Sequence, residues 1–310
     1  MRVPLVMIEN AAPPAGGATR GRLPEWLRKA DAHPESVTAL KRDLRARNLH
    51  TVCESARCPN LNECFHRGQA TFMILGNLCT RGCGFCSVPK GSPEKREFTL
   101  DGNEPANVAR QARAMNLRYV VITSVNRDDL DDGGSHHFAE TVRQVRRALP
   151  DARVEVLTPD FNGDLDAVAR VLDAGPHVFN HNMETVPRLY RRVRPQADYA
   201  QSLEVLRFAR RHRADVLTKS GLMVGLGETA DEVRALLDDL HARGETGVAT
   251  IGQYLQPSRR SLPVARYVPP EEFDAYRDYG LAIGLRMVFA GPFVRSSYMA
   301  DMVESSAQSC

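Results

Sequence analysis

Short runs of apolar and β-branched residues alternate, from residue 71 onward, with stretches whose apolar residues recur at helical spacing. The runs predicted to be strands are 71–76, 118–123, 153–158, 177–182, 215–225 and 248–255. Between them, sets such as Phe138, Val142 and Val145 fall on one face of a helix. Strands that alternate with helices pair in parallel through right-handed crossovers. The sequence therefore predicts an α/β fold with a parallel sheet that helices cover.

Six strand–helix units are fewer than the eight that close a TIM barrel. We therefore expect a partial (β/α)6 TIM-type barrel, whose sheet stays open on one side unless flanking segments close it. The expected division is an N-terminal extension at 1–70, the barrel at 71–260 and a C-terminal segment at 261–310. The extensions are predicted to contain helices at 24–30, 36–48 and 270–284, and an extended segment at 286–298.

The chain of 310 residues carries 41 Lys and Arg against 38 Asp and Glu, which gives a formal net charge of +3. This near balance gives no reason to expect nucleic acid as a partner. No apolar run approaches the roughly 20 residues that cross a bilayer, so we expect no membrane partner either. The N-terminus is compatible with an organelle transit peptide, but Glu9 and the bias toward Pro, Gly and Ala favour a flexible tail. We expect a cytoplasmic protein.

Six of the seven cysteines lie between positions 53 and 86, and the seventh, Cys310, is the last residue. This number is too low for a secreted domain that disulfides hold together, and a cytosolic environment keeps thiols reduced. Thiolates that lie close together repel one another unless a cation holds them. The clustered cysteines therefore predict a metal centre, whereas Cys310 is expected to be an exposed thiol on the tail.

Cys79, Cys83 and Cys86 follow directly after the first predicted strand, at the end of a strand where α/β folds place their chemistry. A compact loop with three thiolates can bind three irons of a 4Fe–4S cluster and leave the fourth iron without a protein ligand. Gly84 allows the backbone to bend tightly there, and Phe85 can shield the cluster from solvent. This loop predicts an iron–sulfur centre with an open iron.

The upstream set, Cys53, Cys58 and Cys64, has two interpretations on its residues alone. His66 would complete a four-ligand structural zinc site with these cysteines. Alternatively, the set holds a second iron–sulfur cluster beside the first.

The spacing of Cys79, Cys83 and Cys86, with Phe85 before the third cysteine, resembles the radical S-adenosylmethionine (radical SAM) superfamily, whose fold is a full or partial parallel (β/α) barrel. The x4 and x5 spacing of the upstream set resembles the auxiliary-cluster motif of the lipoyl synthase family within it. Further segments similar to that family are TSVNRDDLDDGG (123–134), FNHNMETV (179–186), TKSGLMVGLGE (218–228), GQYLQPS (252–258) and GPFVRSSY (291–298). Ser261, Pro269 and Met299 depart from the family pattern, and none of them is an expected ligand.

The resemblance implies an activity: two sulfur atoms are inserted at C6 and C8 of an octanoyl group on a lysine of a carrier protein. It implies two 4Fe–4S clusters and S-adenosylmethionine, which chelates the open iron and yields a 5′-deoxyadenosyl radical. Cys79, Cys83 and Cys86 would hold the radical-generating cluster, and Cys53, Cys58 and Cys64 the auxiliary cluster that is consumed. The implied partners are octanoylated lipoyl carrier domains and a reducing protein that donates electrons.

The family also supplies a serine from an Arg-Ser-Ser-Tyr motif as the fourth protein ligand of the auxiliary cluster. Here that motif ends at Tyr298, and we expect Ser297 to be the ligand, with Ser296 as the alternative. A hydroxyl oxygen binds iron more weakly than a thiolate, so a ligand of this kind can leave when the cluster opens.

Three further sets of residues each have a functional and a structural interpretation. Ser124, Asn182 and Glu184 follow predicted strands and are expected to bind S-adenosylmethionine, or else they cap loops. The basic set Arg188, Arg191, Arg192 and Arg194 is either a docking surface for the carrier or a solvated helix face. The apolar set Leu222, Met223 and Leu226 lines an octanoyl groove or packs in the core.

Two other groups of residues invite metal assignments that we do not make. The run of aspartates at 128–132 lacks the glutamate of an EF-hand, and a helix is predicted to start at Ser135. The histidines at 136, 137, 177 and 181 are scattered, and the thiolates already account for the metals. Two other functions remain open: a radical SAM enzyme whose second cluster only relays electrons, and a zinc-stabilised binding protein without catalysis.

Overall fold

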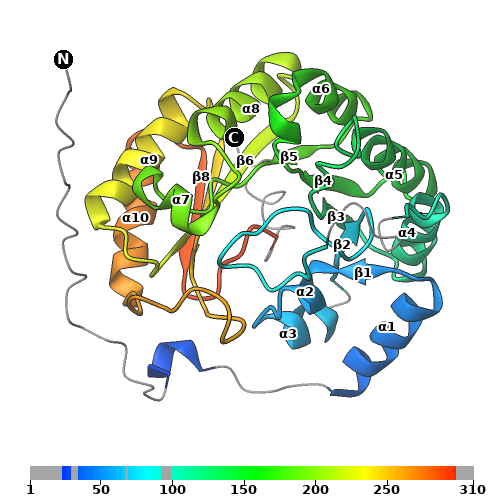
Figure 1. Cartoon of the computed structure of the whole chain (residues 1–310), viewed down its shortest axis with the longest axis horizontal. Helices are drawn as coiled ribbons and strands as arrows, with labels where there is room; N and C mark the ends of the chain where they lie inside the picture. Colours follow the sequence, from blue (N-terminus) through cyan, green and yellow to red (C-terminus); the bar gives the residue numbers. More distant parts are fainter. Residues whose placement is uncertain (1–22, 29–33, 67–68, 92–98, 298–310) are drawn as a thin grey trace, which may run out of the picture.

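The computed structural model describes residues 23–28, 34–66, 69–91 and 99–297. Their strands form a single sheet in chain order (Figure 1). The strands are β1 (His50–Thr51), β2 (Thr71–Ile74), β3 (Tyr119–Ser124), β4 (Arg153–Leu157), β5 (Val178–Asn180), β6 (Leu217–Val224), β7 (Val248–Gln253) and β8 (Met287–Gly291). β1 pairs antiparallel with β2, and every later neighbour pairs in parallel. No pairing between described residues joins β8 back to the start of the sheet, so the barrel is partial, as predicted.

Helices cover the outer side of this curved sheet (Figure 1). The helices are α1 (Pro34–Ala46), α2 (Val52–Ser55), α3 (Leu61–His66), α4 (Glu104–Ala114), α5 (Ser135–Ala148), α6 (Leu165–Asp173), α7 (Tyr190–Val193), α8 (Tyr199–His212), α9 (Ala230–Ala242) and α10 (Pro270–Ala282). Short 3-10 turns occur at η1 (Glu25–Leu27), η3 (Phe161–Gly163) and η4 (Pro187–Leu189). Helix α9 begins with a capping box between Thr229 and Glu232, which satisfies amides that the first turn leaves unpaired.

The six predicted strands are confirmed as β2 to β7, and the flanking segments extend the sheet at both ends. The extended segment at 286–298 contains β8, which pairs with β7, and the short β1 lies outside β2. Helices α1 and α10 are found where they were predicted, and α5 begins at Ser135. The helix predicted at 24–30 is only the turn η1 in its described part. The division at 70 and 260 stays a prediction.

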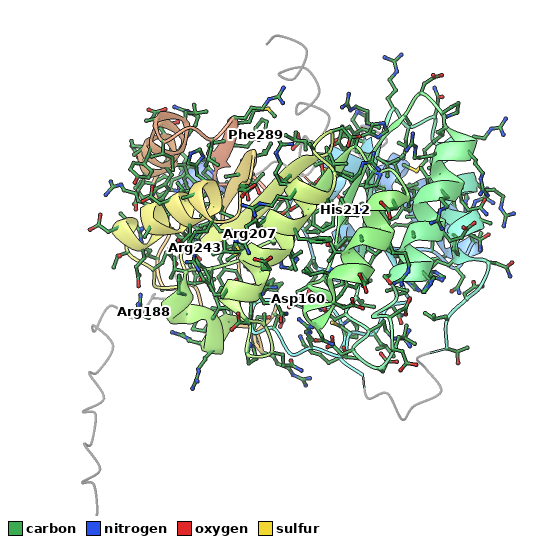
Figure 2. All side chains as sticks on the ribbon, turned by 90° about the horizontal axis from the view of Figure 1, so that it is seen from above. Asp160, Arg188, Arg207, His212, Arg243 and Phe289 are labelled. Carbon is green, nitrogen blue, oxygen red and sulfur yellow. The ribbon has the colours of Figure 1, made fainter. Side chains whose placement is uncertain are left out.

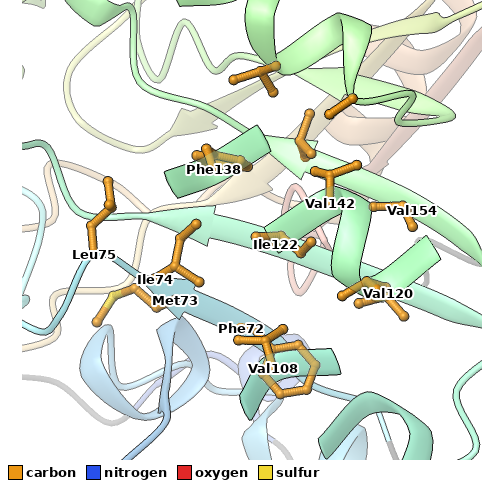
Figure 3. Packing of buried hydrophobic residues seen from close by; sticks show 14 of the residues in the cluster. Phe72, Met73, Ile74, Leu75, Val108, Val120, Ile122, Phe138, Val142 and Val154 are labelled. Atoms are coloured by element: carbon orange, nitrogen blue, oxygen red, sulfur yellow. The ribbon is translucent and has the colours of Figure 1, made fainter. Parts of the chain in front are cut away.

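The core lies between the sheet and its helices, because alternate strand residues point outward toward the helices. Figure 3 shows Phe72, Ile122 and Val154 of the strands against Val108 and Phe138 of α4 and α5. All five are at most 1% exposed. The residues between them point to the inside of the barrel.

A polar network spans the inside of the barrel. Glu155 on β4 accepts hydrogen bonds from Lys219 on β6, at 3.0 and 3.1 Å, from Asn180 at 3.1 Å and from the hydroxyl of Tyr119 at 2.7 Å. Both charged side chains are buried, so only this full set of partners offsets the loss of hydration. The network ties four strands together below the site.

Candidate active site

A cavity of about 280 Å³ opens at the carboxyl ends of the strands and brings together both sets of cysteines. Cys86 reaches it from the loop after β2, and Cys53 and Cys58 reach it from the N-terminal extension. Asn182, Glu184, Leu222, Met223, Thr250, Gly252, Arg295, Ser296 and Ser297 are also among its lining residues. Residues far apart in the sequence therefore share one chamber.

The loop that carries Cys79, Cys83 and Cys86 is fixed by hydrogen bonds to other loops at this end of the barrel. The amide of Gly84 donates to the carbonyl of Val193 at 2.9 Å, and the carbonyl of Gly84 accepts from the amide of Leu262 at 2.9 Å. A Cβ at Gly84 would lie 3.0 Å from the side chain of Leu262, so glycine allows this close approach.

Arg81, which lies between Cys79 and Cys83, anchors the cysteine loop to neighbouring segments. Its guanidinium bonds both carboxylate oxygens of Asp128, at 2.8 Å each, and both of Asp160, at 2.9 and 2.7 Å. It also donates to the side-chain oxygen of Asn162 at 2.6 Å. Two planar fork contacts fix a side chain more rigidly than one point charge can. The cysteine loop is thus bound to the segments that follow β3 and β4.

Two sulfur atoms of this loop receive hydrogen bonds, and its three cysteines are half-buried. The amide of Asn126 donates to the Cys79 sulfur at 3.4 Å, and the amide of Val88 donates to the Cys86 sulfur at 3.5 Å. Burial raises the pKa of Cys86 and raises the pKa of Cys83 to about 11. Without a cation these thiols stay neutral at pH 7, whereas an iron centre supplies the positive charge that thiolates need. The donor set fits an iron–sulfur cluster.

The upstream cysteines line a smaller cavity of about 40 Å³ together with Ser297. Cys53 lies on α2 and Cys64 on α3, with Cys58 in the turn between the two helices. Burial raises the pKa of Cys53 to about 12. His66 is exposed and is not among the residues that line this cavity. Among the described residues, no three His, Cys, Asp or Glu side chains converge on one metal ion, so the zinc set with His66 is not assembled.

Ser297 and Ser296 face different neighbours. A hydrogen bond of 3.0 Å joins the hydroxyls of Thr71 and Ser297, and both the amide and the hydroxyl of Thr71 also bond to Cys53. Ser296 donates to the side-chain oxygen of Asn182 at 2.9 Å. Ser297 alone of the two lines the cavity of the upstream cysteines. The remaining residue of the motif, Tyr298, lies outside the described residues, as does Cys310.

Two glycines make room for the C-terminal loop that carries these serines. A Cβ at Gly252 on β7 would overlap the carbonyl oxygen of Val294. A Cβ at Gly221 on β6 would lie 2.5 Å from the Ser296 oxygen. The loop therefore enters the barrel only because these strands present hydrogen atoms at the two positions.

The predicted S-adenosylmethionine contacts are split between two places. Asn182 and Glu184 line the larger cavity, and the amide of Asn182 donates to the Glu184 carboxylate at 2.9 Å. Burial raises the pKa of Glu184. Ser124, at the end of β3, does not line this cavity, but its buried hydroxyl has no hydrogen-bond partner among the described residues. A buried hydroxyl of this kind is compatible with a polar ligand that would satisfy it.

Sequence reasoning missed several polar atoms near these strand ends. Buried and without a partner in the described part of the chain are Asn126 Oδ1, Thr158 Oγ1, Asn180 Oδ1 and His181 Nε2. Their position in the sequence could have marked these residues as site candidates, because each follows or ends one of the strands β3 to β5. His181 bonds the Thr158 carbonyl at 2.9 Å, and burial lowers the pKa of its ring to about 4. Nδ1 of this neutral ring must then be the donor, which leaves Nε2 as an acceptor.

The other predicted groups have structural partners. In the aspartate run, Asp128 binds Arg81, Asp129 binds Arg127 at 2.7 Å, and Asp132 accepts from the amide of His136 at the start of α5. The side chains of His136, His137, His177 and His181 also bond to protein groups.

The four arginines weighed as a docking surface do not act together. Arg188 pairs with Glu232 at 2.6 Å, and Arg194 is buried, where it donates to the carbonyl of Asn182 at 2.8 Å. Only Arg191 and Arg192 remain exposed without an ion pair to a described residue. Of the predicted apolar residues, Leu222 and Met223 line the cavity, whereas Leu226 is packed in the core.

Comparison with known proteins identifies the family to which this chain belongs. Residues 73–240 match the family model of the radical SAM superfamily, and residues 10–58 match that of the N-terminal domain of lipoyl synthase of the radical SAM family. A lipoyl synthase of Chloroflexus aurantiacus is 49% identical over 306 residues, which cover 99% of this chain and 98% of that protein. The chain belongs to the lipoyl synthase family. Other lipoyl synthases that it resembles come from Rubrobacter xylanophilus, 52% identical with 94% and 92% covered, and Thioalkalivibrio sulfidiphilus, 54% identical with 90% and 86% covered.

Solved structures support the fold of this lipoyl synthase family member. HydG, a maturase of the FeFe-hydrogenase, is 16% identical, with a TM-score of 0.52 over 84% of this chain and 69% of that one. Streptococcus suis SuiB is 11% identical, with a TM-score of 0.50 over 74% and 52%. Membership identifies the chain as a radical SAM enzyme, and a 4Fe–4S cluster and S-adenosylmethionine follow from the superfamily. None of the helices in the described ranges has the length and apolar character to cross a membrane.

Proposed function

We propose that this enzyme inserts two sulfur atoms, at C6 and C8, into an octanoyl group attached to a lysine of a carrier protein. The observation that carries the proposal is the shared cavity, which cysteines of both sets line together with Ser297. A reaction that creates a radical on a carbon chain and then delivers sulfur to it needs both centres within reach of one substrate.

The proposed ligands are those that the family resemblance implies, and the cavities support part of the set: Cys86 lines the larger one, and Cys53, Cys58, Cys64 and Ser297 line the smaller one. Cys79, Cys83 and Cys86 would hold the radical-generating 4Fe–4S cluster, and Cys53, Cys58, Cys64 and Ser297 a second, auxiliary cluster. When bound, the first cluster and S-adenosylmethionine supply a 5′-deoxyadenosyl radical, and the auxiliary cluster supplies sulfide. Thr71 would hold the Ser297 hydroxyl in place and share its own hydroxyl with Cys53. Ser297 would thus supply the auxiliary cluster with an oxygen ligand that binds iron more weakly than a thiolate does.

The wall between the two sets suits an acyl chain. Phe85, Leu157, Leu222, Met223, Tyr254, Leu255 and Val294 are among the residues of the larger cavity. Each methylene group that such a wall takes out of water contributes about 0.8 kcal/mol to binding. These side chains also exclude water, which protects a carbon radical from side reactions.

Polar groups at the strand ends would orient S-adenosylmethionine. Glu184 presents a half-buried carboxylate that can accept from the ammonium of the ligand, and Asn182 presents an amide beside it. The buried hydroxyl of Ser124 can bond to a polar group of the same ligand. We also propose an octanoylated lipoyl carrier domain as the substrate, a reducing protein as the electron donor, and a cytoplasmic location.

The test is an anaerobic assay with reductant, S-adenosylmethionine and an octanoyl-lysine peptide. We expect 5′-deoxyadenosine and a dithiolated peptide, together with loss of acid-labile sulfide from the protein during a single turnover. Formation of 5′-deoxyadenosine without thiolated peptide, or sulfide that stays intact through many turnovers, contradicts the proposal. The second result would indicate an auxiliary cluster that only relays electrons.

A further inference from the structure

The cysteine loop at 79–91 and two segments beside it, 186–197 and 255–268, contain basic residues but no Asp or Glu. They are in contact, because Gly84 bonds to Val193 on one side and to Leu262 on the other. The chain as a whole is close to neutral, so this part of the surface differs from the rest.

Some cations of these segments are neutralised or buried within the protein. Arg81 binds Asp128 and Asp160, Arg188 binds Glu232, Arg266 binds Glu272, and Arg194 is buried against backbone carbonyls. The others are exposed, and with Arg57 from the N-terminal extension they form what we call the basic rim: Arg57, Lys90, Arg191, Arg192, Arg259 and Arg260. Within the described ranges none of them has a carboxylate partner.

Some exposed arginines elsewhere on the surface do have acidic partners. Figure 2 shows Arg207 and Arg243 on the helical wall of the barrel, away from Arg188 and Asp160. Arg207 pairs with Glu204, and Arg243 pairs with Asp239 at 3.1 Å. Arg207 and Arg243 thus have acidic partners, whereas the residues of the basic rim have none in the described ranges.

Part of the basic rim adjoins the larger cavity. Arg57 lines the cavity and donates to the carbonyl of Pro257, another lining residue, at 3.2 Å. Arg259 and Arg260 form the tip of a turn that the Ser258 and Ser261 hydroxyls close at 2.9 Å. Helix α7, which carries Arg191 and Arg192, lies across the cysteine loop from α2 and α3 (Figure 1).

From this arrangement we infer that the basic rim docks an acidic surface of the carrier protein around the lysine that bears the acyl chain. The inference rests on the proposed function, because it takes the occupant of the cavity to be attached to a protein. A carrier must bring its own surface against the mouth to place the acyl group inside. Complementary charge then speeds the encounter and selects the partner, and salt screens it.

The test uses the enzyme with its clusters assembled and compares Arg259→Glu/Arg260→Glu with the control Arg110→Glu/Arg147→Glu. The control makes the same change of charge on exposed residues of α4 and α5. Binding of an octanoylated lipoyl carrier domain is measured at low salt and at about 0.5 M salt. Thiolation of an uncharged octanoyl-lysine tripeptide is measured in parallel.

We expect the rim variant to bind the carrier domain about tenfold more weakly at low salt, with little difference at high salt. The control should bind within about twofold of the wild type, and both variants should thiolate the tripeptide normally. Arg191→Glu/Arg192→Glu on α7 provides a second variant with the same expected loss, should the turn at 258–261 be disturbed.

Unchanged carrier binding by both rim variants overturns the inference. So does tighter binding of a mixed-sequence RNA oligonucleotide than of the carrier domain. A wild-type enzyme that fails to thiolate the tripeptide refutes the proposed function instead, and the binding data still decide whether the basic rim docks the carrier.

Discussion

Arg81 donates to both carboxylate oxygens of Asp160, and the two side chains are 4% and 0% exposed. Burial by itself raises the pKa of Asp160, but the hydrogen bonds and charge of Arg81 outweigh it and lower that pKa to about 2. The carboxylate is therefore ionised at neutral pH, and Arg81 is its main partner, with the amide of Asn162 at 3.1 Å as another. The contact connects the cysteine loop to the segment after β4.

Arg81→Met should destabilise the protein and loosen the cysteine loop. Removal of one partner of a buried ion pair costs about 3 to 5 kcal/mol. We expect a lower free energy of unfolding for the cluster-free chain, and loss of roughly half the iron after reconstitution, because one of two 4Fe–4S clusters would be affected. Arg81→Lys should recover part of both, since it keeps the charge but not the fork.

The matched control is Arg191→Met, which removes an exposed arginine without an ion pair to a described residue. Its iron content and unfolding should equal those of the wild type. Normal iron content in Arg81→Met would show that the loop does not need this anchor.

Ser297→Ala and Ser296→Ala should separate the two steps of the reaction. Because Ser297 faces the upstream cysteines, its loss should abolish thiolation while 5′-deoxyadenosine still forms. Ser296→Ala should keep thiolation, since it removes only the bond to Asn182. Product analysis by mass spectrometry, with iron counted in both variants, checks this. The reverse pattern would assign the ligand role to Ser296.

Gly252→Ala should displace the loop that carries these serines, because the new methyl group would overlap the carbonyl of Val294. We expect the auxiliary cluster to be lost or labile while the radical-generating cluster assembles. Iron analysis and electron paramagnetic resonance of the reduced protein report each cluster. Gly102→Ala is the control, since a Cβ at that position meets nothing within 4 Å.

Replacement of Lys219 should show how much the polar network inside the barrel depends on charge balance. Lys219→Met leaves Glu155 buried without its cation, which costs about 3 to 5 kcal/mol of unfolding free energy. Glu155→Gln/Lys219→Met removes both charges and should recover most of that loss. Chemical denaturation of the three proteins measures the effect, and a double variant no more stable than the single one would contradict it.

His181 should make the folded state sensitive to mild acid. Burial lowers the pKa of its ring from an unfolded value of 6.5 to about 4, so the unfolded chain binds more protons between these values. The free energy of unfolding should therefore fall by about 2 kcal/mol between pH 7 and pH 4.5. His181→Gln should flatten this dependence, whereas replacement of the exposed His212 on α8 should not. An equal slope in His181→Gln would exclude the ring as its source.

The sequence predicts β2 to β7 because each strand is an apolar run between helical patterns, which is what burial on both faces requires. It predicts Ser297 only through family resemblance, since a Ser-Ser pair carries no signal of its own. The contact between Arg81 and Asp160 spans 79 positions and depends on how two loops meet, which local patterns do not encode. The sequence predicts only an extended segment of the C-terminal extension where β8 lies, because irregular, proline-rich sequence precedes its helix.

Side-chain hydrogen bonds join the start of the open sheet to the segment that follows β8. Thr71 on the first long strand reaches Ser297 beyond the last one, and Asn60 holds the carbonyl of Phe293 at 2.8 Å. Opening a closed barrel requires a row of backbone hydrogen bonds between two strands to break. Opening this edge requires only side-chain hydrogen bonds such as these to break. The open edge of such a sheet can separate to admit a large substrate while the strands and helices stay folded.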